Sequence, residues 1–168
     1  VFVEWSRAND WVQDVNYPTN MQYASALDSA ARLYGRPELA AKAERIRKVI
    51  REQAFDGEFF VDNALRGEDG SLHLTGNHSE VCQYFAFYFG VADPGSYPEL
   101  WEKLVTEFGP GRVEKGACPE VAPANSFIGN MLRMELLSAA GRNRQVMDES
   151  VEYLLYMAER TGTLWEND

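Results

Sequence analysis

The sequence has few cysteines, few histidines and no dense cluster of basic side chains. Two cysteines, Cys82 and Cys118, are too few for a disulfide framework, and Cys82 falls in an apolar segment typical of a buried free thiol. The two histidines, His73 and His78, lie five residues apart in a glycine-containing loop, without a second pair of ligands. The sequence therefore gives no support for a metal site.

Basic residues are outnumbered, with 16 against 26 acidic residues and a net charge of -10. Nucleic-acid backbones and anionic membranes are bound by basic clusters, so we expect neither as a partner. The densest basic run, residues 45–51, alternates with apolar residues as on the exposed face of a helix. No apolar run reaches the roughly 18 residues of a membrane span, and no signal peptide is visible.

The 168 residues fit a single domain, residues 1–168. Because the sequence begins at Val1, without methionine and in mid-pattern, we expect it to be a piece of a longer protein. The compartment of that protein stays open, since the bacterial cytoplasm and the periplasm both fit the composition.

Hydrophobic periodicity predicts an all-α chain whose helices come in pairs. The expected helices span residues 20–34, 37–50, 79–90, 97–108, 126–140 and 144–160. Gly35, Gly90 and Gly141 close the first helix of each pair and lie 55 and 51 residues apart. Between the first two pairs, the aromatic segment 55–62 and the stretch 72–74 predict one small β-hairpin within residues 55–75. Three helical hairpins of nearly fixed period indicate a solenoid or a closed toroid.

The first helix of each predicted pair carries few charges, and residues 84–89 are apolar on every side, which predicts burial on every side. A closed ring buries its inner helices in this way, so we favour the toroid. The loops that lead into the inner helices would then line a central cup. Those loops hold the candidate substrate-binding residues Trp5, Trp11, Asn20, His78 and Glu80.

Each candidate also has a structural explanation. Asn20 and Ser79 are good helix N-caps, and Glu80 is favoured early in a helix by the helix dipole. His78 can be a hydrogen-bonded loop residue, and the two tryptophans can be packing residues.

The C-terminal stretch Gly162–Glu166 follows an amphipathic helix and places a carboxylate directly after a tryptophan. An indole offers a flat apolar platform and a carboxylate exchanges protons, a combination that suits an enzyme acting on a sugar. Alternatively, Trp165 closes the bottom of a helical core and Glu166 is a solvated tail residue.

With these features together, the chain resembles the catalytic six-hairpin (α/α)6 barrel of α-L-rhamnosidases, glycoside hydrolase family 78. The matching motifs are Phe2–Trp5, Tyr17–Asn20 and, most specifically, Gly162–Glu166. The resemblance implies three of the six hairpins, from the C-terminal half of the barrel. It also implies that Glu166 is the general base, with Trp165 beside it in the substrate site.

The resemblance implies an inverting hydrolase of terminal α-L-rhamnosyl or similar residues, which needs two carboxyl groups and no metal or organic cofactor. Two features depart from the family pattern. Glu4 replaces the usual aspartate before the tryptophan, and no segment matches the one that carries the general acid, so this chain alone would lack that acid. The rest of a parent chain, or a second copy, would cover the open flank. A helical-repeat interaction module and other six-hairpin enzymes, such as unsaturated glucuronyl hydrolases, remain alternatives.

Overall fold

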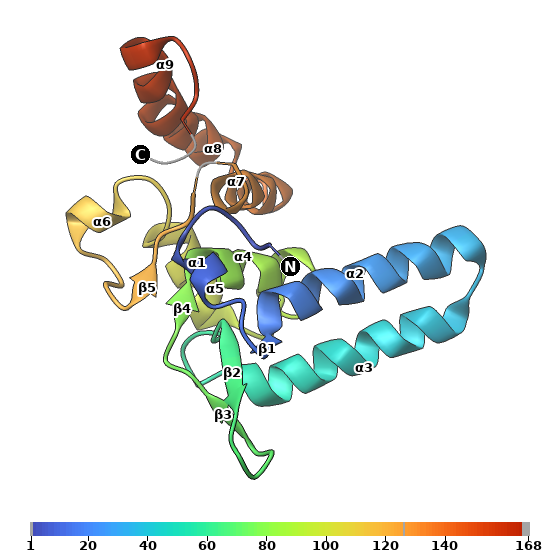
Figure 1. The fold of residues 1–168 in the computed structure, drawn as a ribbon. Coiled ribbons are helices and arrows are strands. Elements are labelled where there is room, and N and C mark those ends of the chain that lie inside the picture. Colours follow the sequence, from blue (N-terminus) through green and yellow to red (C-terminus); the bar gives the residue numbers. More distant parts are fainter. Residues whose placement is uncertain (1, 126, 166–168) are drawn as a thin grey trace.

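A computed structural model describes residues 2–125 and 127–165 of the chain, and the proposed base Glu166 lies outside these residues. Helices dominate the fold, as predicted, and short strands join them (Figure 1). In chain order the elements are α1 (Arg7–Asp10), β1 (Val15–Asn16), α2 (Tyr17–Tyr34), α3 (Pro37–Ala54), β2 (Asn63–Arg66), β3 (Leu72–Leu74), β4 (His78–Ser79), α4 (Glu80–Tyr88), α5 (Pro98–Thr106), α6 (Arg112–Lys115), β5 (Val121–Ala122), α7 (Gly129–Ala139), α8 (Asn143–Ser150), the π-helical η1 (Val151–Leu155) and α9 (Tyr156–Thr161).

Helices α2 and α3 form an antiparallel hairpin that extends away from the other elements (Figure 1). Helix α2 begins three residues earlier than predicted, because Asn16 rather than Asn20 is its N-cap and accepts a hydrogen bond of 3.0 Å from the Thr19 amide. Pro18 fits the first turn, where a helix needs no amide hydrogen. The predicted burial of this helix is wrong for its far end, where Leu33 and Tyr34 are exposed.

Helix α4 is buried as predicted as far as Phe87, but the predicted burial of residues 84–89 is wrong at Tyr88, which is 47% exposed. The helix contacts α2 and α7, and every residue from Glu80 to Phe87 is buried. Ser79 caps the helix and accepts a hydrogen bond of 3.1 Å from the Cys82 amide. Both cysteines of the chain are free and buried. The fold therefore buries the N-terminal end of α4 together with its cap, Ser79.

The predicted β-hairpin exists, but its first strand lies further along the chain than the aromatic segment. Strand β2 pairs antiparallel with β3, and β1 pairs with the other edge of β2. The aromatic segment instead turns back on itself through a bridge between Phe55 and Phe60. Phe59 and Phe60 are buried in the main core, whereas β3 is exposed. Burial of the two aromatic rings explains why this segment is not a strand of the hairpin. Removing the rings from water stabilises the fold more than strand pairing at an exposed edge would.

The last predicted hairpin comprises α7 and the segment α8–η1–α9. Helix α7 is only partly buried, so the prediction of a buried inner helix is wrong on the side of Met131, which is exposed. The predicted continuous helix over residues 144–160 is interrupted by one π-helical stretch, η1. The described residues thus confirm the succession of helical hairpins, whereas the closed toroid stays a prediction. Within them, no helix combines the length and apolar character that crossing a membrane requires.

Candidate functional site

Three loops that are far apart in the sequence meet at the N-terminal end of α4. Strand β4, directly before this helix, pairs in parallel with β5, which belongs to the loop before α7; His78 is opposite Val121 and Ser79 is opposite Ala122. Helix α1, in the first loop, contacts β4. The loops that lead into the alternate helices therefore converge, as the sequence predicts.

Glu4 connects the first of these loops to the start of α7. Its side chain is fully buried and accepts hydrogen bonds from the Ser6 hydroxyl (2.5 Å) and from the backbone amides of Asn125 (3.3 Å) and Gly129 (3.0 Å). Burial raises the pKa of Glu4 to about 7, against the opposing effect of these hydrogen bonds. A Cβ atom on Gly129 would lie 2.3 Å from the Cβ of Ala124, so only glycine allows this close approach.

Asp62 is a second buried carboxyl group beside α4. Its Oδ1 atom accepts a hydrogen bond of 2.7 Å from the Ser79 hydroxyl, and its Oδ2 atom has no hydrogen-bond partner among the described residues. Burial, with a smaller contribution from the nearby charge of Glu4, raises the pKa of Asp62 to about 8, against the opposing effect of the hydrogen bonds from Ser79. Asp62 and Glu4 can therefore hold protons close to neutral pH at the centre of the converging loops.

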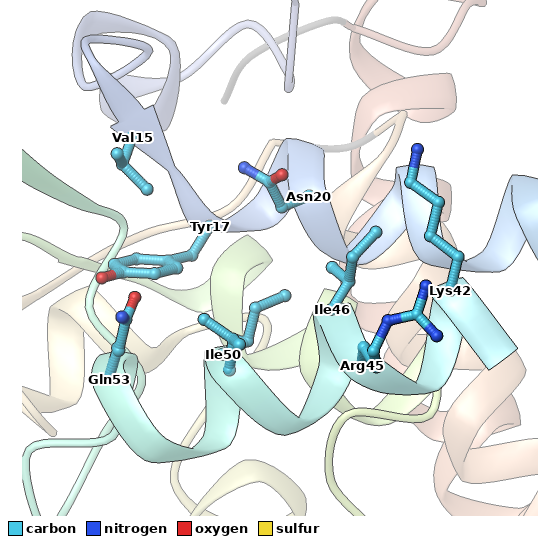
Figure 2. A pocket seen from close by; sticks show the side chains of 9 residues that line it. Val15, Tyr17, Asn20, Lys42, Arg45, Ile46, Ile50 and Gln53 are labelled. Atoms are coloured by element: carbon cyan, nitrogen blue, oxygen red, sulfur yellow. The ribbon is translucent and has the colours of Figure 1, made fainter.

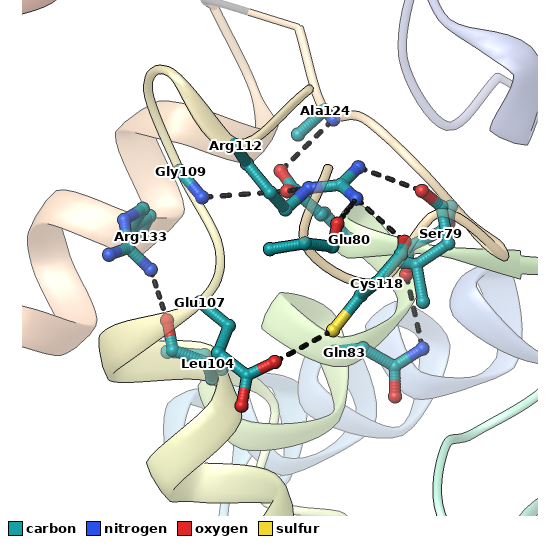
Figure 3. Close-up of polar contacts among 12 residues, drawn as sticks. Ser79, Glu80, Gln83, Leu104, Glu107, Gly109, Arg112, Cys118, Ala124 and Arg133 are labelled. Atoms are coloured by element: carbon teal, nitrogen blue, oxygen red, sulfur yellow. Dashed lines mark hydrogen bonds and ion pairs between the residues drawn. The ribbon is translucent and has the colours of Figure 1, made fainter. Parts of the chain in front are cut away.

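Glu80 is buried in an ion pair with Arg112, in which the Arg112 Nε group donates to the Glu80 carboxylate (Figure 3). The guanidinium also donates to the carbonyls of Ala117 and Cys118, both at 2.8 Å, and of Val121 at 2.7 Å. Burial raises the pKa of Glu80, while the charge of Arg112 opposes that change. The prediction that Glu80 binds substrate does not fit this geometry, because only 2% of the residue is exposed.

His78 lies at the edge of the same region and pairs with a carboxylate. Its Nε2 atom is 2.8 Å from Asp56 Oδ2, and its ring lies 5.5 Å from that of Phe59. Burial alone would raise the pKa of Asp56, but amide hydrogen bonds from Phe59 and Glu58, together with His78, hold it below its usual range. Among the described residues His78 Nδ1 has no hydrogen-bond partner, so this nitrogen is left for a further ligand.

The tryptophans of the first loop differ in exposure. Trp5 is 53% exposed and meets Phe2 edge to face, with ring centroids 4.6 Å apart. Trp11 is half-buried, and the guanidinium of Arg7 lies 5.5 Å from its ring centroid. Trp5 therefore offers a free aromatic surface, as a sugar platform requires.

The remaining predicted site residues lie on other elements. Asn20 is in the first turns of α2 and donates a hydrogen bond of 2.7 Å to the Asn16 carbonyl. Trp165 follows α9; its indole donates to the Thr161 hydroxyl at 2.6 Å and its ring lies 5.7 Å from that of Tyr156.

Asp62 and Arg112 lie in the region where the three loops meet, but the sequence does not mark them as candidates. Glu4 stands out in the sequence only as a departure from a motif. Nothing local in the sequence distinguishes them, because their partners lie 17, 32 and up to 125 residues away. Within residues 2–125 and 127–165, no group of three or more His, Cys, Asp or Glu side chains is arranged to hold a metal ion.

Comparison with solved structures gives a match to a rhamnosidase of the GH78 family from Bacillus sp. GL1. The match has a TM-score of 0.77 and 20% sequence identity, and it covers 98% of this chain. The chain spans 17% of that enzyme's length. No protein-family model and no curated protein matches the sequence. The chain therefore has the fold of a segment of a GH78 rhamnosidase.

Proposed function

We propose that this chain is part of a glycoside hydrolase that acts on terminal α-L-rhamnosyl or similar sugar residues. The observation that carries the proposal is the match of almost the whole chain to one segment of a GH78 rhamnosidase. The motif Gly162–Glu166 supports the same assignment independently of the fold, because it joins an indole to a carboxylate.

In the proposed mechanism the sugar is released with inversion of configuration. Glu166 acts as the general base and removes a proton from the attacking water. The general acid protonates the leaving oxygen from a position roughly 6.5–9.5 Å away, which leaves room for the water. That acid is contributed by a segment other than this chain, and neither a metal nor an organic cofactor takes part.

Trp5, Trp11 and Trp165 are proposed to form the apolar walls of the sugar site. The exposed ring of Trp5 supports this role, since the C–H faces of a sugar pack on indole. His78, held by Asp56 through Nε2, offers Nδ1 to a sugar hydroxyl. Asn20 is proposed as a further polar contact; Glu80, in its ion pair, holds the loop rather than the sugar.

The test compares hydrolysis of an aryl α-L-rhamnoside by a protein that contains this chain within a complete barrel and by its Glu166→Gln variant. We expect the substitution to lower kcat by at least about a hundredfold, because general base catalysis contributes that much. Proton NMR of the first sugar anomer released should show inversion. Glu159→Gln is the matched control, since Glu159 is an exposed glutamate of the same C-terminal segment.

Full activity of Glu166→Gln, or retention of configuration, would contradict the proposed mechanism. The 168 residues alone should release no aryl alcohol. If they do, and Glu166→Gln abolishes the activity, the acid lies within this chain after all. Turnover of an unsaturated glucuronide in place of the rhamnoside would assign the chain to another six-hairpin enzyme. Absence of any sugar binding would favour the alternative of an interaction module, which the exposed apolar residues of α8 and η1 also suit.

A further inference from the structure

The backbone on both sides of Trp5 is held by hydrogen bonds within the first loop. The amide of Val3 donates to the side-chain oxygen of Asn9 at 3.1 Å. Glu4, directly before Trp5, accepts a hydrogen bond of 2.5 Å from the hydroxyl of Ser6, directly after it. The same hydroxyl oxygen caps α1. These contacts lie inside the chain, so they do not depend on which segments surround the indole.

The carboxyl group of Glu4 also fastens this loop to the start of α7, 121 and 125 residues further on. Its Oε2 atom accepts a hydrogen bond of 3.0 Å from the Gly129 amide, and both oxygens lie 3.3 Å from the amide nitrogen of Asn125. A Cβ atom on Gly129 would lie 3.0 Å from Glu4 Oε2 and 2.3 Å from the Cβ of Ala124, so only glycine allows this approach. The side chain of Glu4 thus joins the first loop to the start of α7.

We propose that Glu4 is a positioning residue for the sugar site and sets the place of the Trp5 ring relative to the start of α7. The inference rests on the proposed function, in which Trp5 is a wall of that site. The ring contact between Trp5 and Phe2 lies within the same loop, so it cannot fix the indole relative to α7. Glu4 is fully buried and meets no substrate, so it acts on the sugar through Trp5.

The geometry at this position requires the length of a glutamate side chain. Glu4→Asp shortens the side chain by one C–C bond, about 1.5 Å. Because N–H···O hydrogen bonds span about 2.7–3.2 Å, the amides of Asn125 and Gly129 are then out of reach of an unmoved backbone. Either these bonds are lost or the first loop shifts toward α7, and both changes displace Trp5. A gap of about 1 Å already removes a quarter to a half of the dispersion attraction between two surfaces.

The test measures kcat and KM for an aryl α-L-rhamnoside with the complete barrel that contains this chain, and with its Trp5→Ala, Glu4→Asp and double variants. Each single variant should raise KM about three- to tenfold, the contribution of one aromatic contact, with kcat little changed. The double variant should have the KM of Trp5→Ala, because Glu4 acts through the indole. Two independent contributions would instead multiply.

Ile50→Ala is the control for a loss of stability. Ile50 is 2% exposed on α3 and lines a groove of about 360 Å³ between α2 and α3 (Figure 2). Its truncation leaves a cavity in the core but alters no hydrogen bond of Glu4. A partly unfolded variant contains less active enzyme, which lowers the apparent kcat and leaves KM unchanged. An increase in KM therefore separates a displaced Trp5 from a weakened fold.

The position of the indole can also be followed without any sugar, by 19F NMR of the protein labelled with 5-fluorotryptophan. Trp5→Ala assigns the Trp5 signal by its loss. Glu4→Asp should shift or broaden that signal, because the ring changes its surroundings, whereas Ile50→Ala should leave it unchanged.

An unchanged KM in Glu4→Asp would overturn the proposal while the proposed function stands, and so would an unchanged Trp5 signal. A double variant whose KM is several-fold above that of Trp5→Ala would also overturn it, since Glu4 would then act by another route. If Trp5→Ala leaves KM unchanged, Trp5 is not a wall of the sugar site and this inference falls with that role. A complete barrel that cleaves no rhamnoside would refute the proposed function itself, and this inference with it.

Discussion

Replacing Arg112 by methionine should strongly destabilise the fold, because Arg112 and Glu80 form a pair that is almost fully buried. Methionine keeps the length of the side chain but leaves the Glu80 carboxylate without its counter-ion. Removing one partner of a buried ion pair costs about 3–5 kcal/mol. The free energy of unfolding of a domain is typically about 5–15 kcal/mol, so the loss is a large part of the total.

Urea unfolding followed by circular dichroism measures this effect. With a dependence of about 2 kcal/mol per molar urea, the midpoint for Arg112→Met should fall by about 2 M. The loss should be smaller at pH 5 than at pH 8, because removal of Arg112 raises the pKa of Glu80 further and a protonated Glu80 needs no counter-ion. Adding Glu80→Gln to Arg112→Met should recover at least about 1 kcal/mol, since it removes the uncompensated charge.

Arg144→Met is the matched control. Arg144 pairs with Asp148 at 3.1 Å, but its side chain is 91% exposed, so the expected cost is below about 1 kcal/mol. If Arg112→Met shifts the urea midpoint no more than Arg144→Met does, the buried pair does not organise the loops around α4.

Two further predictions concern the interior of the molecule. Glu4 and Asp62 bind protons more tightly in the folded chain than in the unfolded one, because burial raises both pKa values. Their stabilising effect is therefore complete below the unfolded pKa of ~4. It is lost as pH rises through the folded pKa values of about 7 for Glu4 and about 8 for Asp62. The melting temperature should therefore fall between pH 6 and pH 9, and Asp62→Asn should reduce that fall; a melting temperature that rises over this range would contradict the assignment. Gly109 has φ +93° and an added Cβ would lie 2.3 Å from Arg133 Nε, so Gly109→Ala should lower the free energy of unfolding by about 2–5 kcal/mol in chemical denaturation. Gly116→Ala, with φ +67° and no atom within 4 Å of the added Cβ, should cost only about 1–2 kcal/mol, and equal losses at the two glycines would show that the clash is relieved.

The parts of the fold that were predictable depend on signals within a few residues. Gly35, Gly90 and Gly141 close the helices as expected, all with positive φ, because glycine adopts the left-handed conformation without strain. The continuous apolar run of α4 likewise predicts its burial, and Ser79 before it predicts the cap. Local chemistry thus specifies the succession of elements.

The parts that were missed depend on contacts between distant segments. Arg112 looks like a surface charge in the sequence, and only its contacts with Glu80 and with three carbonyls of the loop before α7 explain its burial. Asn16, rather than Asn20, caps α2 because its side chain is also held by the Asp62 carbonyl, 46 residues further on. The same division applies to the candidate site. The convergence of its loops could be predicted from the alternation of helices, whereas the burial of the carboxyl groups at its centre could not.

The carbohydrate assignment is tested most directly by following the indole N–H signals of the four tryptophans by NMR while L-rhamnose is added to the 15N-labelled chain. Trp101 provides an internal control, because it lies on α5 with its ring 5.1 Å from that of Phe87 in the core. We predict saturable shifts for Trp5, Trp11 and Trp165, with Trp101 unchanged and with D-glucose weaker than L-rhamnose. Indole signals that L-rhamnose leaves unmoved, or that both sugars move equally, would contradict a rhamnoside site.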